Sequence, residues 1–343
     1  MKDFIMENNR VLSPEENNEE YLIKNLRPKT LKEYIGQIKI KRSLDISIQA
    51  ALQRKETLDH VLLAGPPGLG KTTLSNIIAH ELSSNIYITS GPVIEKQGDL
   101  AAMLTQLEKG DVLFIDEIHR LGKSVEEILY SAMEDFQLDI MIGKGPSARS
   151  IRIEINPFTL VGATTRSGLI GAPLRNRFGM ILEIDFYDEN SLKKIINRSA
   201  EILDIGIDSE SSDLISRISR GTPRISNRIL RRVRDMATVD QKRIIDIKTV
   251  EKTMEMLGID FYGLDNTDRK LLKIIIKNYN GGPVGIKALS ASTGIESETI
   301  SEVYEPYLLQ KGFLIRTQRG RCAAEKAYKH LKVKYQGKNT SLW

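Results

Sequence analysis

The fold is decided by Gly65-Pro66-Pro67-Gly68-Leu69-Gly70-Lys71-Thr72, which fits the pattern G-x-x-x-x-G-K-[ST] at every position. The apolar run at 60–64 precedes it as a buried strand would, and the segment 72–82 has the spacing of a helix. Glycines in such a loop let backbone N–H groups turn toward phosphate oxygens, and the helix start adds partial positive charge. A chance glycine turn would lack both neighbours. We therefore interpret the stretch as a phosphate-binding loop, with Lys71 reaching the β- and γ-phosphates of ATP and Thr72 holding Mg²⁺.

A second apolar run, Val112-Leu113-Phe114-Ile115, ends in the acidic pair Asp116 and Glu117. Beside a phosphate loop, Asp116 would face the metal ion, and Glu117 would orient and deprotonate the attacking water. Alone, an acidic pair at a strand end is an ordinary surface feature. Together with the loop, it favours hydrolysis of the nucleotide over binding alone.

Two further segments hold candidate residues. Gly162-Ala163-Thr164-Thr165-Arg166 ends another apolar run, so a hydroxyl there would lie between the loop and the acidic pair and sense the γ-phosphate. An arginine within Leu174-Arg175-Asn176-Arg177-Phe178 would reach the γ-phosphate of a neighbouring subunit. Taken singly, these residues are more often ordinary caps and surface side chains.

Thr30 to Glu33 reads T-x-x-E, which predicts a capping box that opens a short helix, and Ile40, Leu44, Ile48, Ala51 and Leu52 at helical spacing predict a longer amphipathic helix. Strand and helix patterns then alternate through the first half of the chain. Apolar runs at 86–89, 159–163 and 180–186 are further expected strands, separated by helical patterns such as 125–133. This alternation predicts an α/β fold with a parallel sheet and helices on both faces. One segment departs from it, because runs at 138–142 and 150–155 flank a glycine-containing turn. We expect an inserted β-hairpin whose exposed apolar residues need a partner.

The second half of the chain has a helical pattern, and a basic two-stranded segment follows near its end. From Asp188 to about residue 257 the pattern is all helical, with Thr222 as an N-cap and Pro223 at the first helical position. Further on, a helix, a turn at 293–295 and another helix precede a basic two-stranded segment at 313–321. We predict a winged-helix domain, with a plain three-helix packing module as the alternative. The expected domains are a flexible segment at 1–25, a large ATPase domain at 26–186 with its hairpin at about 137–156, a small helical lid at 187–258 and a winged-helix domain at 259–343.

Composition limits the class of protein. The 343 residues are 41% hydrophobic and 28% charged, as in globular domains with a real core. Cys322 is the single cysteine, so it can form neither an intrachain disulfide nor a multi-cysteine zinc site. Apolar runs break before the about 20 residues that a spanning helix needs, and the acidic start is unlike a signal peptide. We expect a cytoplasmic protein without a membrane association.

Charge is distributed unevenly. The net charge is +5, but from Gln310 onward nine cations face one acid, Glu325. A single-sign end of this kind indicates a polyanionic partner such as DNA, and a solvated tail is the alternative.

Taken together, these motifs resemble the RuvB family, the bacterial Holliday-junction branch-migration ATPases of the AAA+ class. The loop GPPGLGKTT and the strand LFIDEIHRL point only to an AAA+ ATPase. The later motifs are more specific, and they are SAMEDFQLDIMIG, GATTRSG, PLRNRFG, GTPRISNRILRRVRD, DRKLL, GGPVG and GFLIRTQRGR. The resemblance runs from about Leu26 to about Arg321, so it covers nearly the whole chain.

The resemblance implies specific residue roles. At the nucleotide, it implies adenine contacts from Leu26 and Arg27, and phosphate contacts from Gly68, Gly70, Lys71, Thr72 and Thr73. It implies metal and water contacts from Asp116 and Glu117, a γ-phosphate sensor at Thr165 and a lid arginine at Arg224. It also implies a hinge residue at Tyr187 and a nucleotide-side stretch of Glu134, Asp135 and Phe136. Arg177 is implied as the finger from the adjacent subunit, and Arg316 and Arg321 as DNA contacts.

The resemblance also implies partners: a homohexamer around duplex DNA, RuvA docked on the hairpin near Ile140–Ile155, a four-way junction contacted without sequence preference, and the RuvC resolvase. Two rivals remain. A clamp loader shares the core and lid, but a basic winged helix favours pulling on DNA. A nucleotide-gated DNA-binding regulator would not hydrolyse ATP, and Glu117 argues against it.

Overall fold

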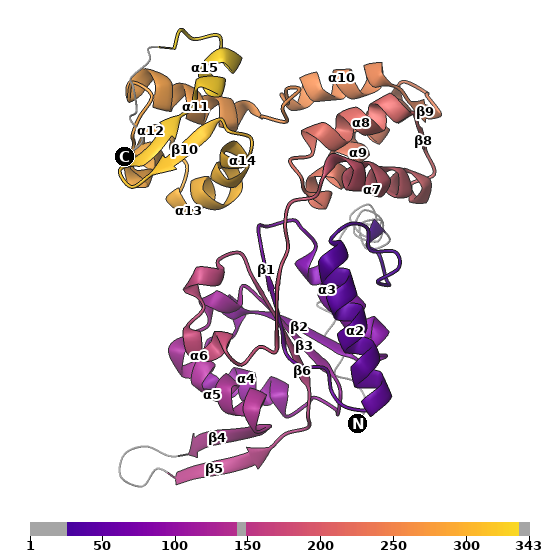
Figure 1. Cartoon of the computed structure of the whole chain (residues 1–343), viewed down its shortest axis with the longest axis vertical. Helices are drawn as coiled ribbons and strands as arrows, with labels where there is room; N and C mark the ends of the chain where they lie inside the picture. Colours follow the sequence, from indigo (N-terminus) through magenta and orange to yellow (C-terminus); the bar gives the residue numbers. More distant parts are fainter. Residues whose placement is uncertain (1–25, 143–148, 336–343) are drawn as a thin grey trace.

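The computed structural model describes residues 26–142 and 149–335. The expected flexible segment at 1–25, the hairpin turn and the last residues, 336–343, lie outside that part. In Figure 1 the α/β domain lies below, and a helical unit and a C-terminal unit lie side by side above it. The chain thus has the predicted α/β class, followed by two smaller units.

A five-stranded parallel sheet forms the core of the first unit, in the order β2-β3-β6-β1-β7. Its strands are β1 (Val61–Ala64), β2 (Ile86–Ser90), β3 (Val112–Asp116), β6 (Thr159–Thr164) and β7 (Met180–Glu183). The five predicted strands are confirmed, although the last ends at Glu183 and not at residue 186. The three central strands, β3, β6 and β1, deliver the loop, the acidic pair and the threonine pair to one edge.

Helices cover both faces of this sheet, as predicted. They are α2 (Ile38–Arg54), α3 (Lys71–Glu81), α4 (Gln97–Leu104), α5 (Lys123–Glu134) and α6 (Ala172–Arg175), with 3-10 turns at Gly91–Val93, Ile118–Arg120 and Ser167–Leu169. Alternate strand residues point to opposite faces: Val61 and Leu63 pack against α2 and α3, whereas Leu62 packs with α4 and α5. In α2 the predicted face is buried except Leu52, which is 47% exposed and was wrongly included.

The helix expected at Thr30–Glu33 is only a turn. Glu33 N–H donates to Thr30 Oγ1 at 3.3 Å, which is one half of the predicted capping box. The Glu33 carboxylate instead accepts from the N–H of Lys29, at 3.0 Å. Because the carboxylate bonds to the N–H of Lys29 and not to that of Thr30, the reciprocal bond of the box does not form.

The inserted hairpin is confirmed as β4 (Gln137–Ile142) and β5 (Arg149–Glu154), antiparallel with Ile140 opposite Ile151. It projects away from the domain (Figure 1). Leu138 is buried at its base, whereas Ile151 is 46% exposed. An apolar side chain is therefore presented on a projecting element.

The second unit contains α7 (Glu189–Ile202), α8 (Ser209–Ile218), α9 (Pro223–Val239) and α10 (Ile247–Leu257). Two short strands, β8 (Gly206–Ile207) and β9 (Ile244–Ile245), pair in parallel and were not predicted, because two residues show no periodicity. Thr222 occupies the N-cap position of α9, but its side chain makes no cap hydrogen bond. Its hydroxyl donates to the carbonyl of Ser219 at 3.3 Å.

The third unit is a winged helix, as predicted. It contains α11 (Asn266–Asn278), α12 (Ile286–Thr293), α13 (Ser297–Thr299), a π-helical segment (Ile300–Tyr304), α14 (Glu305–Gln310), β10 (Leu314–Thr317), β11 (Gly320–Ala323) and α15 (Glu325–His330). Val284 bridges Arg321 and adds a third backbone segment to the wing. In the part of the chain described, no helix is long and apolar enough to span a bilayer.

Candidate active site

The predicted nucleotide-binding elements meet at the carboxyl edge of three adjacent strands. The loop follows β1, the acidic pair ends β3, and Thr164 and Thr165 end β6, which lies between them. Parallel strands place their carboxyl ends at the same edge, where ligands of α/β sheets bind. The topology alone therefore brings together segments that are about 50 residues apart in sequence.

The loop holds its lysine inward. Lys71 begins α3 and is 8% exposed, and its Nζ donates to the carbonyls of Gly65 at 2.7 Å and Pro66 at 2.9 Å. Burial lowers the pKa of Lys71 to about 8. Phosphate oxygens can replace these two carbonyls, because the ammonium has three donors and already faces the cavity.

A cavity of about 320 Å³ opens between the α/β domain and the helical unit. Leu26 and Arg27 contribute to its wall. It is also lined by the remaining predicted residues Gly68, Gly70, Lys71, Thr72, Thr73, Asp116, Glu117, Thr165, Tyr187 and Arg224.

Arg224 ties the helical unit to the loop. Its N–H donates to the carbonyl of Gly68 at 3.4 Å. Gly68 has φ +82°, and a Cβ there would lie 3.2 Å from the Cβ of Arg224. Glycine is required by both the backbone conformation and this close approach. The start of α9 thus lies directly on the phosphate loop.

A tyrosine pair marks the passage from sheet to helical unit. Tyr187 donates its hydroxyl to Tyr34 at 2.8 Å, and its N–H donates to the carbonyl of Gly221 at 2.9 Å. Burial raises the pKa of Tyr187 to about 12, so the phenol stays protonated. Tyr34 lines the cavity and was missed, because the segment around it has no periodic pattern.

The acidic pair has a constrained backbone. Glu117 has φ +48°, and its N–H donates to Asp116 Oδ1 at 2.9 Å. Its carboxylate accepts from Arg120 Nη1 at 3.0 Å and remains partly exposed toward the cavity. A non-glycine residue in the left-handed region is uncommon, and this conformation follows directly after the last residue of β3, Asp116.

Thr164 and Thr165 face different surroundings. Thr164 is buried, and its hydroxyl lies 3.0 Å from His119 Nδ1, whereas Thr165 lines the cavity. Burial lowers the pKa of His119, which favours the neutral imidazole beside the acidic pair. Nothing in the sequence singled out His119.

Arg177 lies apart from the cavity. It donates to Glu134 at 3.0 Å and to the carbonyl of Pro173 at 2.7 Å, with its guanidinium 4.5 Å from the Tyr130 ring centre. Asp135 and Phe136 follow Glu134, and none of these three residues lines the cavity either. The predicted residues therefore form two groups: one lines the cavity, and the other, Arg177 with Glu134, Asp135 and Phe136, lies outside it.

The two predicted DNA arginines also differ. Arg316 projects from β10 with 65% of its side chain exposed. Arg321, opposite it on β11, donates from Nε and Nη2 to Glu305 at 3.1 and 2.9 Å, and Glu305 is 2% exposed. Arg319 is exposed beside the turn of the wing and was not singled out.

Three family models match the chain in order: the Holliday junction DNA helicase RuvB P-loop domain at residues 26–184, the RuvB AAA lid domain at 187–260 and the RuvB C-terminal winged helix domain at 261–332. The chain belongs to the RuvB family. A relative in Kosmotoga olearia, named Holliday junction branch migration complex subunit RuvB, is 68% identical over 324 residues, which cover 94% of this chain and 95% of the relative. The relative of that name in Thermotoga maritima is 63% identical over 321 residues, 94% and 96% of the two chains.

The solved Thermotoga maritima RuvB Holliday junction branch migration motor has the same fold, with a TM-score of 0.84 at 60% identity over 90% of this chain and 99% of that one. RuvB-family membership establishes the AAA+ P-loop, lid and winged-helix classes. It also makes the chain a P-loop AAA+ ATPase, whose phosphate loop lines this cavity.

A magnesium ion fits the donors at this RuvB-family site. In residues 26–142 and 149–335, no group of three His, Cys, Asp or Glu residues could hold a metal by itself. Thr72 and Asp116 both line the cavity and offer one hydroxyl and one carboxylate. Mg²⁺ is commonly held by few protein oxygens together with substrate phosphates and water, so this donor set suits it.

Proposed function

We propose that this chain is the ATP-hydrolysing motor subunit of a Holliday-junction branch-migration complex. The observation that carries the proposal is the single cleft in which the phosphate loop, the acidic pair and the lid arginine Arg224 meet, in a chain that ends in a winged helix. Membership of a family whose named members are branch migration subunits supports it.

Each cleft residue then has a role set by its position. Lys71 leaves its loop carbonyls and binds the β- and γ-phosphates, while Thr72 and Asp116 hold Mg²⁺, which neutralises phosphate charge when bound. Glu117 orients the attacking water and accepts its proton. Thr165 contacts the γ-phosphate from the sheet edge and Arg224 contacts it from α9. When hydrolysis removes the γ-phosphate, the α/β domain and the helical unit therefore each lose a contact.

Arg177 acts on a neighbouring subunit. Its place outside its own cavity, held by Glu134 and Tyr130, supports a finger that is already ordered before the neighbour arrives. Glu134, Asp135 and Phe136 then belong to the same intersubunit surface. A finger in trans at every site requires a closed ring, and a homohexamer is the ring that the family resemblance implies.

DNA binds through the wing without reading sequence. Arg316 lies at the edge of Glu305, with Nε 4.0 Å from Oε1 and 65% of its side chain exposed, so it can turn to a phosphate, and Arg321, the second proposed DNA contact, is held beside it by the buried pair with Glu305. The projecting hairpin with Ile151 is the docking edge for RuvA, and RuvC acts on the same complex in the cytoplasm.

The units have the boundaries 26–186, 187–258 and 259–343, and the 1–25 segment precedes them.

Incubating synthetic four-way junctions with ATP, with and without RuvA, tests the function. Strand-exchanged products that need ATP support a branch-migration motor, and their absence in both reactions contradicts it. A nucleotide-gated regulator remains the second candidate. It would bind ATP and DNA but release negligible phosphate, so phosphate release measured with and without duplex DNA separates the two.

A further inference from the structure

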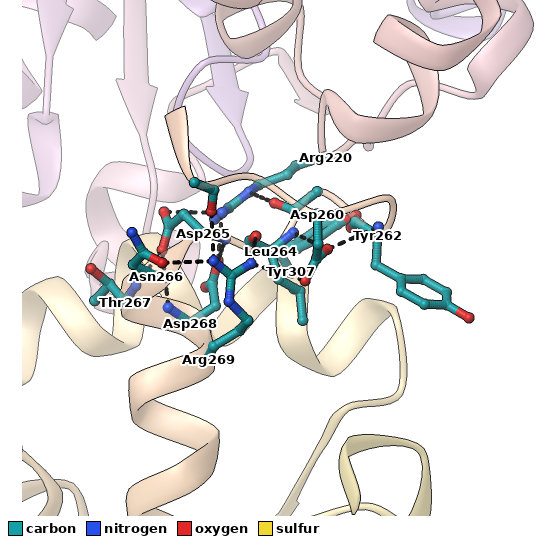
Figure 2. A network of polar contacts seen from close by, with 12 residues as sticks. Arg220, Asp260, Tyr262, Leu264, Asp265, Asn266, Thr267, Asp268, Arg269 and Tyr307 are labelled. Carbon is teal, nitrogen blue, oxygen red and sulfur yellow. Dashed lines mark hydrogen bonds and ion pairs between the residues drawn. The ribbon is translucent and has the colours of Figure 1, made fainter. Parts of the chain in front are cut away.

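One arginine of the helical unit is buried inside the winged helix. Arg220, just after α8, donates from Nε to the carbonyl of Gly263 at 2.8 Å and from Nη2 to Asp265 at 3.1 Å and Asp268. Figure 2 shows these contacts converging on its guanidinium, with Tyr307 beside it. The guanidinium lies 5.3 Å from the centre of the Tyr307 ring. One side chain therefore contacts three separate parts of the neighbouring unit.

The Arg220–Asp268 pair is closed to water, whereas Asp265, at the rim of the contact, has 33% of its side chain exposed. Arg220 is 8% exposed and Asp268 is fully buried, so the ion pair is neither solvated nor screened by salt. A buried pair broken from one side leaves an uncompensated charge, so it resists separation more than a surface pair does. The backbone also fits closely here, because a Cβ on Gly263 would lie 2.7 Å from the carbonyl oxygen of Ile218. The two units meet as a fixed joint at this point.

The other end of the joint is the nucleotide cleft. Arg220 is followed by Gly221, whose carbonyl accepts from Tyr187, and by the start of α9. Arg224 lies four residues from Arg220, and its N–H donates to Gly68 in the phosphate loop. The segment 220–224 thus contacts the winged helix through Arg220 and the phosphate loop through Arg224.

We propose that Arg220 is a positioning residue that couples the DNA-bound winged helix to Arg224 in the ATP cleft. Force on the wing reaches Arg220 through the α11 start and moves the segment that carries Arg224. Removal of the γ-phosphate from beside Arg224 moves the wing along the same path. The inference rests on the proposed function, because it needs the cleft to hydrolyse ATP and the wing to grip DNA.

A purely structural role for Arg220 makes a different prediction. If Arg220 only stabilised the fold, its loss would lower stability and reduce every activity by the same factor. A coupling residue separates the activities. Its loss spares ATP binding and DNA binding, and it removes the influence of DNA on hydrolysis.

The test compares Arg220→Ala with Arg217→Ala in the full-length protein. Arg217 lies on α8, three residues before Arg220, and is exposed, so its substitution removes the same charge and leaves the joint intact. The kcat and KM for ATP are measured by phosphate release with and without linear duplex DNA, and duplex affinity by anisotropy. For Arg220→Ala we expect KM and duplex Kd within about threefold of the parent, and a DNA-dependent change in kcat reduced by about tenfold or more. Arg217→Ala should match the parent.

Two milder variants cover the case in which Arg220→Ala unfolds. Arg220→Lys keeps the charge but loses the planar fork, so it should restore part of the DNA response. Asp265→Asn keeps an oxygen that can accept from the N–H groups of Thr267 and Asp268, and it removes the charge facing Arg220. Its DNA response should be intermediate.

Each result decides between the two ideas. A normal DNA response in Arg220→Ala, or an equal loss of basal and DNA-dependent hydrolysis in all three variants, overturns the coupling. A parent protein whose hydrolysis ignores DNA overturns the proposed function together with the coupling. A parent that responds to DNA while the variants respond equally overturns the coupling alone.

Discussion

Arg321 and Glu305 form a two-pronged ion pair within the winged helix, at 2.9 and 3.1 Å, and Glu305 is almost completely buried. The pair joins the second wing strand to the start of α14. Arg316, in register opposite Arg321, has no comparable enclosure and projects into solvent. Two arginines of one hairpin are therefore expected to respond differently to substitution.

Arg316→Ala should weaken duplex binding on all sequences and lower the slope of log K against log salt by about 0.9, the loss of one phosphate contact. Lys248→Ala, an exposed cation of the helical unit, is the control and should leave the slope unchanged. Arg321→Ala should instead destabilise the winged helix by about 3–5 kcal/mol, since it removes both hydrogen bonds to the buried Glu305 carboxylate and leaves only Arg316 Nε, at 4.0 Å, beside it. Salt titrations of duplex binding test the prediction for Arg316→Ala, and thermal melts test that for Arg321→Ala. Weakening of DNA binding confined to one DNA sequence would indicate base readout.

Glu117→Gln should bind ATP normally and hydrolyse it more slowly by roughly 10²-fold or more, because the amide cannot accept the proton of water. Glu127→Gln, an exposed change on α5, serves as the control for charge loss. Single-turnover hydrolysis and nucleotide binding are measured on both. Near-normal turnover in Glu117→Gln would remove the basis for its assignment as the base.

Arg177→Ala should abolish hydrolysis while leaving ATP affinity within about twofold, because Arg177 lies outside its own cavity. Lys71→Ala should be inactive for a different reason, the loss of phosphate binding. Mixing the two should restore part of the activity, since some interfaces then pair an intact loop with an intact finger. An inactive mixture with demonstrated subunit exchange would argue that Arg177 acts within its own chain.

Burial raises the pKa of Asp268 from 3.8 to about 6, an effect that outweighs the nearby Arg220. Among the described residues its Oδ1 has no hydrogen-bond partner, which fits a disfavoured charge. A raised carboxyl pKa means that protonation favours the folded state. Its contribution is complete below about pH 4 and is lost as the pH rises through about 6.

Asp268→Asn lacks this titration. Between about pH 5 and about pH 7.5, the unfolding free energy of the variant relative to the parent should rise by roughly 1 kcal/mol. Other titrating groups are common to both proteins and cancel in the difference. Thermal and urea unfolding at the two pH values measure it. A relative stability that stays constant over this range would mean that Arg220 lowers the pKa at least as much as burial raises it.

Sequence patterns predicted the sheet well, because buried strands and a phosphate loop are local features. Val112–Asp116 and Val61–Ala64 could be recognised from their own residues and the turns beside them. Leu52 and Thr222 were misjudged because the exact burial and hydrogen bonding of one side chain depend on its neighbours in space.

The parts of the candidate site that are local motifs could be predicted from the sequence, whereas contacts between distant parts of the chain could not. Arg220 makes its hydrogen bonds with residues 43 to 48 positions further along the chain and also contacts Tyr307, so no local pattern marks it. Arg316 and Arg321 look alike in the sequence, and only the packing of Glu305 beneath the wing separates them.

The second helix of the helix-turn-helix has an electrostatic consequence. Glu298 and Glu302 face the α/β domain, where both pair with Arg166. A DNA backbone approaching this helix would meet carboxylates that are already turned toward the protein, whereas the wing offers cations. Because these carboxylates are paired with Arg166, the cations of the wing dominate the field of this unit, and they attract a duplex to the wing before any contact forms, whatever its sequence.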